Sequence, residues 1–68
     1  MAVEIMVKNE LVDELRRKLD PMCADHPPKV SSDEKVPNAT FLTYSNVQGE
    51  AYFAACAMQL GASSVRKL

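Results

Sequence analysis

The chain has 68 residues, which is enough for one small domain and too few for two. Its composition, 47% apolar and 25% charged, is typical of a globular domain and excludes a disordered chain as the default. A net charge of −1 provides no overall attraction to nucleic acid or anionic lipid, and the richest apolar stretch, 51–60, is about half as long as a membrane-spanning helix.

The first predicted element is a strand over residues 2–8. Val3, Ile5 and Val7 fall on one side of it, and this period of two indicates one buried face. Asn9 is a favourable N-cap residue, and residues 10–19 have the pattern of an amphipathic helix, with acids near its start and bases near its end. The apolar side of this helix consists of Leu11, Val12, Leu15 and Leu19.

Proline and charged residues divide the chain after this helix. Asp20-Pro21 ends the helix or begins one short further turn. Residues 27–38 contain three prolines, two serines and four charges. This composition predicts a loop over 27–38, which we expect to be mobile.

The second half of the chain repeats the order of strand and helix. Residues 39–45 are rich in strand-forming types and predict a second strand, with Phe41 on one face and Leu42 and Tyr44 on the other. If this strand lies at a sheet edge, it can pair with a strand of a partner. Ser45 and Gln48 resemble a capping box that begins a helix over about 47–60.

Gly61 is a suitable residue to end that helix, and residues 63–68 form a third short strand or a frayed tail. The predicted fold is therefore a small two-layer α+β domain of β-α-loop-β-α(-β) order over residues 1–68. In an alternative interpretation, residues 3–19 form one long helix with a heptad seam, and the chain is mostly α.

Charge is almost absent from one region of the chain. Between Val36 and Val65 the only charged residue is Glu50, and the predicted helix 47–60 is apolar nearly all round. Such a helix is normally buried on several sides, and so short a chain lacks the material to cover it. We therefore predict an interface for another protein or for a second copy, formed by Ala51, Ala54, Ala55, Met58, Tyr44 and Tyr52. The competing interpretation is that the 27–38 loop and the C-terminus cover this helix.

Three short motifs have residue types that can carry chemistry. Cys23 and His26 have the spacing of a metal-ligand pair or of a nucleophile and base, but there is one such pair only. The Ser45–Gly49 junction has the strand-to-helix position that can hold an anion, with one glycine and no lysine. The basic run 16–18 fits a solvated helix end. We predict no catalytic residue, no metal ligand and no cofactor, and we expect no nucleic-acid partner.

The leading functional interpretation is a non-enzymatic protein-interaction module, acting as a regulator, an inhibitor or a structural subunit through residues 39–60. Small chains of this kind are common among accessory and phage-encoded factors. One alternative is a dimeric regulatory domain with a small ligand near Ser45–Gly49, and a second is metal- or thiol-dependent activity at Cys23 and His26. With two cysteines and no secretory leader, we expect a cytoplasmic protein with a protein partner or its own copy as partner, and no membrane association.

Overall fold

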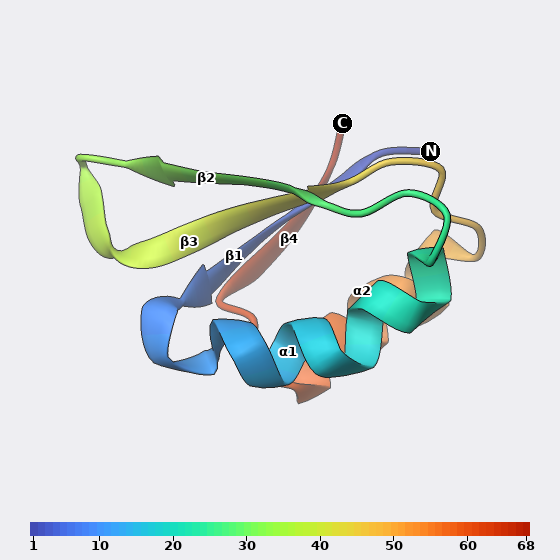
Figure 1. Ribbon diagram of the computed structural model, residues 1–68, viewed down its shortest axis with the longest axis horizontal. Helices are drawn as coiled ribbons and strands as arrows, with labels where there is room; N and C mark the ends of the chain where they lie inside the picture. The colour runs from blue at the N-terminus through green and yellow to red at the C-terminus, as the bar shows by residue number, and fades with distance from the viewer.

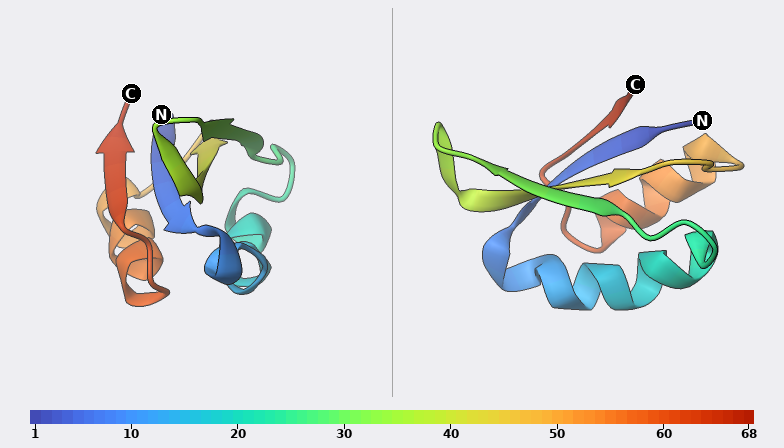
Figure 2. Two further views of the ribbon diagram at one scale, coloured as in Figure 1. Left: turned by 90° about the vertical axis from the view of Figure 1, so that its left-hand side faces the viewer. Right: turned by 45° about the horizontal axis from the view of Figure 1, so that its top comes forward.

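The structure, a computed structural model, describes all residues 1–68. A four-stranded antiparallel sheet carries both helices on one of its faces (Figure 1), and the views in Figure 2 show the opposite face without a covering layer. Neither helix has the length and apolarity needed to cross a membrane. In chain order the elements are β1 (Val3–Lys8), the 3-10 turn η1 (Asn9–Leu11), α1 (Val12–Leu19), the 3-10 turn η2 (Asp20–Cys23), β2 (Lys29–Asp33), β3 (Val36–Tyr44), α2 (Glu50–Gln59) and β4 (Ser64–Lys67).

The predicted α+β class is confirmed, and the mostly α alternative is wrong because Val3–Lys8 form a strand. The strand order in the sheet is β2-β3-β1-β4, so β3 separates β2 from β1. This connectivity is the split β-α-β arrangement, which hosts many activities and implies none. Because β3 pairs on both sides, residues 39–44 are not a sheet edge.

The core lies between the sheet and the helices. The alternation of β1 turns Val3, Ile5 and Val7 toward the helices, where they are 1% exposed or less. On β3, Leu42 lies opposite Ile5 and Tyr44 lies opposite Val3, so these side chains share that face. The helices contribute Leu15, Leu19, Phe53 and Ala57. The rings of Tyr44 and Phe53 meet edge-on with centroids 5.1 Å apart.

Both predicted helix starts need correction. Asn9 does not cap a helix, because it is the first residue of η1 and its side-chain oxygen accepts a hydrogen bond from the Thr40 hydroxyl at 2.6 Å. The capping box at Ser45 and Gln48 is also wrong, because α2 begins at Glu50 after Gly49 with φ +67°. Glycine reaches this left-handed conformation without steric cost.

The end of α2 follows the prediction. Leu60 and Gly61 complete its last turn, and Gly61 has φ +100°. The four-residue strand β4 then pairs with β1, which confirms a third predicted strand and not a frayed tail.

Residues 27–38 were expected to form a loop, and this expectation is wrong. β2 and the first part of β3 form a hairpin there. All five residues of β2 are exposed, so no apolar alternation reveals the strand. Pro27 and Pro28 precede β2 and therefore interrupt none of its pairing with β3. The expected mobility of this segment stays a prediction.

Candidate functional site

The outer side of α2 is an apolar region that the fold leaves uncovered. Phe53 and Ala57 pack against the sheet and are 1% exposed or less, while Tyr52 is 70% and Met58 is 52% exposed. Ala51 and Ala55 lie between these two side chains on the helix and are also exposed. We call Ala51, Tyr52, Ala55 and Met58 the α2 surface.

The α2 surface is uncovered because the structure has only two layers. The 27–38 segment is part of the sheet, and β4 pairs with β1. The interpretation in which these segments cover the helix is therefore wrong. A contiguous patch of exposed apolar side chains often marks an interaction surface.

The structure brings together four of the six predicted interface residues. Ala54 is half-buried at the side of the α2 surface. Tyr44 does not belong to it, because its side chain is 0% exposed. The predicted strand was apolar on both faces, and Tyr44 is on the face that the helices cover, opposite Val3.

A groove between the two helices continues the α2 surface. Its volume is about 280 Å³, and the side chains around it include Lys18, Met22, Tyr52, Cys56, Gln59 and Leu60. Met22 projects from η2 and is 43% exposed. Lys18 is the only charged residue around this groove. The sequence prediction missed Met22, although Asp20-Pro21 did indicate the helical turn that carries it.

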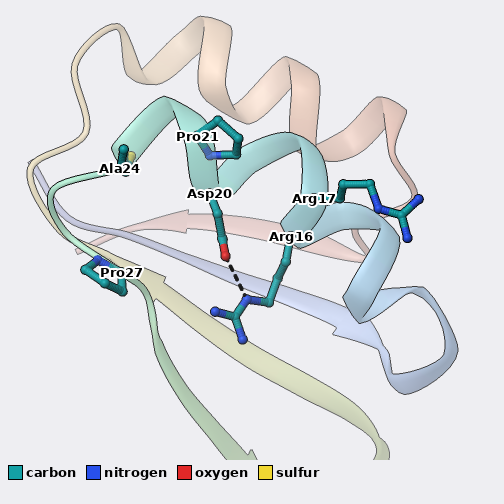
Figure 3. Close-up of a pocket in the computed structure, with 7 residues that line it drawn as sticks. Arg16, Arg17, Asp20, Pro21, Ala24 and Pro27 are labelled. Carbon is teal, nitrogen blue, oxygen red and sulfur yellow. Dashed lines mark hydrogen bonds and ion pairs between the residues drawn. The ribbon is translucent and has the colours of Figure 1, made fainter.

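A polar network fixes the other side of η2. The Asp20 carboxylate accepts a hydrogen bond from the Tyr44 hydroxyl at 2.5 Å and one from Arg16 Nε at 3.1 Å. Burial and the bond to Asp20 raise the pKa of Tyr44 far above its ordinary value. Figure 3 shows Arg16 reaching Asp20 while Arg17 points away from it. These residues line a hollow of about 420 Å³ with Pro21 and Pro27, and the paired charges give the network a structural role.

Two motifs that are separate in the sequence meet at the end of η2. Cys23, His26, Asn46 and Gln48 surround one hollow of about 270 Å³. Cys23 is buried in the core cluster and His26 is exposed. Burial, together with the charge of Asp20, raises the pKa of the Cys23 thiol above 9.0, which disfavours the thiolate that nucleophilic chemistry or metal binding needs. No three His, Cys, Asp or Glu side chains come together in a group that suits a metal.

Comparison of the chain with protein-family models, with curated proteins and with solved structures gives no match. The raised pKa of the Cys23 thiol disfavours its thiolate, and the Asp20 network is internally paired. The α2 surface and its groove bring together three of the exposed large apolar side chains, Met22, Tyr52 and Met58.

Proposed function

We propose that this chain is a non-enzymatic protein-interaction module, which binds an amphipathic helix of another protein on the α2 surface and in the adjoining groove. The observation that carries the proposal is the exposure of Tyr52 (70%) and Met58 (52%) on a helix side without a charged residue. Aromatic residues and methionine are enriched at interfaces, where charged residues are depleted. A module of this kind acts as a regulator, an inhibitor or a structural subunit.

The shape and charge of the groove support a helical partner. The hollow of about 280 Å³ between the two helices has room for an apolar side chain from one face of a partner helix. Met22 and Met58 are unbranched and adapt to such side chains. Lys18 at the rim favours an acidic residue beside that side chain. The partner is therefore expected to present an apolar ridge with flanking acidic residues.

A small ligand near Ser45–Gly49 has weaker support. The hollow there has a volume of about 270 Å³, close to that of the groove beside α2, so volume does not separate the two sites. Its polar side chains, which include His26, Asn46 and Gln48, are all exposed. Convergent buried polar groups, which fix a ligand's orientation, are not found among them.

The proposal is tested by affinity capture from native lysate with two matched variants. Met58→Glu places a charge on the α2 surface, and Leu68→Glu places one on a similarly exposed residue (59%) outside it. We expect the unchanged chain and Leu68→Glu to retain one protein in stoichiometric amount, and Met58→Glu to lose it. Amide exchange of the purified complex should then protect α2 and one amphipathic helix of the partner.

Three outcomes would contradict the proposal. One is the absence of a stoichiometric partner. Another is equal retention by Met58→Glu and Leu68→Glu, which would place the contact elsewhere. The third is a second copy of this chain as the only protein retained through α2.

A further inference from the structure

The strand β2 has an unpaired edge. It pairs with β3 on one side only, and as an outer strand of the sheet it has no neighbour on the other. All five of its residues are exposed, and Val30 is 51% exposed. The irregular register between the two strands lies on β3, since Ser31 is opposite Phe41 while Asp33 is opposite Val36. β2 therefore stays extended and presents free N–H and C=O groups.

The sequence of β2, Lys-Val-Ser-Ser-Asp, is complementary to itself in the antiparallel direction. When two copies are aligned about Ser31, Lys29 of each lies opposite Asp33 of the other. Residues 29, 31 and 33 point to the same face of a strand, so each pair of opposite charges is in direct cross-strand contact. Val30 lies opposite Ser32 of the second copy on the other face.

The charges involved form no ion pair within the chain. The ion pairs of the structure join Arg16 to Asp20, Arg66 to Glu4 and Lys67 to Glu50, so neither Lys29 nor Asp33 takes part in one. The other outer strand, β4, differs in this respect because its two charges, Arg66 and Lys67, are both basic and already paired. Self-pairing of β4 would place no acidic side chain opposite them.

We propose that two copies of this chain pair antiparallel through β2, with Ser31 on the two-fold axis. The two four-stranded sheets then form one continuous sheet. The two-fold axis of antiparallel neighbours is perpendicular to the sheet, so the helices of both copies lie on the same side and both α2 surfaces face the same way. This inference does not depend on the proposed function. It adds a bivalent arrangement, which increases avidity for any partner that carries two helices.

Charge reversal tests the pairing and its register. Lys29→Asp places two pairs of acidic side chains across the interface, and Asp33→Lys places two pairs of basic ones. We expect each variant alone to raise the dimer dissociation constant about tenfold. An equimolar mixture of the two variants restores both opposite-charge pairs and should form a heterodimer as stable as the unchanged dimer. Sedimentation equilibrium measures all of these dissociation constants.

A double variant, Lys29→Asp with Asp33→Lys, also restores both pairs in one chain and should dimerise normally. It is needed because Asp33 also accepts a hydrogen bond from the Lys35 N–H in the hairpin turn at 2.9 Å. A monomer at every concentration up to about the millimolar range, or a dimer that the single variants leave unchanged, would overturn the inference. Met58→Glu should leave this dimer intact, so failure of the pairing is distinguishable from failure of the α2 site.

Discussion

The two helices pack on the same face of the sheet, but their solvent-facing sides differ in charge. Both pack large side chains on the same face of the sheet, Leu15 and Leu19 from α1 and Phe53 from α2, all 1% exposed or less. On the outside, α1 presents four charged residues, Asp13, Glu14, Arg17 and Lys18, whereas α2 presents the uncharged α2 surface. Because the sheet requires only the inner face of each helix, folding does not explain the difference between the outer faces.

The apolar side chains of the α2 surface stay in water in the single chain, so their burial does not contribute to its stability. Burying apolar area contributes about 25 cal/mol per Å², and this gain is absent wherever a side chain stays in water. Tyr52 and Met58 therefore contribute little to the stability of the monomer and would contribute to a complex. Variants of the inner and outer faces of the two helices test this difference.

The largest effect is expected on the inner faces, where the two helices should behave alike. Phe53→Ala is expected to cost about 3–5 kcal/mol and Leu15→Ala about 2–5 kcal/mol, because each leaves a cavity in the core. A domain of this size has a total stability of about 3–5 kcal/mol, so both variants should lose the cooperative transition in urea followed by circular dichroism. A stable fold in either variant would show that its helix is not an essential layer.

The next effect concerns the glycine that ends α2. A Cβ on Gly61 would stand 2.9 Å from Leu11 Cδ1, and the residue has φ +100°. Gly61→Ala should therefore destabilise the chain by about 1–3 kcal/mol. Gly49→Ala is the matched control, because Gly49 has φ +67° and nothing within 4 Å of the added carbon; it should lose only about 1 kcal/mol. Equal losses would mean that the closeness of Leu11 to the added carbon does not add to the backbone strain.

A third effect is a pH-dependent contribution to stability beside α1 that has no counterpart beside α2. Tyr44 donates its hydroxyl hydrogen to Asp20, at the end of α1, and α2 has no equivalent network. The pKa of Tyr44 is raised in the folded chain by burial and by this bond, so its contribution is fully present below the ordinary tyrosine pKa of about 10 and is lost as the pH rises above it. The raised pKa of Cys23 acts in the same direction from 9.0 upward.

Tyr44→Phe should lower the free energy of unfolding by about 1–3 kcal/mol at neutral pH and should flatten its decline in alkaline solution. Tyr52→Phe is the matched control on the α2 surface and should leave both quantities unchanged. Urea titrations between pH 7 and 11 measure them. A decline that persists unchanged in Tyr44→Phe would exclude the Asp20 network as its cause.

The sequence predicted the inner faces of the fold and failed where a residue's partner is distant in the chain. The period of two in Val3–Val7 and the arc of Leu15 and Leu19 are local patterns, so β1 and α1 followed from them. β2 is exposed on both faces and therefore has no pattern of this kind. Asn9 was expected to cap a helix but bonds to Thr40, which is 31 residues away.

The candidate site was predictable in part for the same reason. The α2 surface follows from helical spacing and from the absence of charge over residues 51–60, which are both local. Tyr44 was assigned to it wrongly, because a strand with apolar residues on both faces does not indicate which face the helices cover. Met22 was missed because the groove exists only once η2 and α2 are packed together.

The smallest effect on stability is expected when the outer side of α2 is given charged residues like those of α1. Ala51→Glu with Ala55→Lys gives α2 an outward pair of opposite charges four residues apart, as on α1. Such a pair stabilises a helix by about 0.2–0.5 kcal/mol, which offsets the small helix-propensity loss on replacing two alanines. The free energy of unfolding should therefore change by less than about 0.5 kcal/mol, while capture of the partner is lost. If the double variant instead destabilised the chain by about 2 kcal/mol or more, as core substitutions do, the α2 surface would be part of the folded core and its lack of charge would need no partner to explain it.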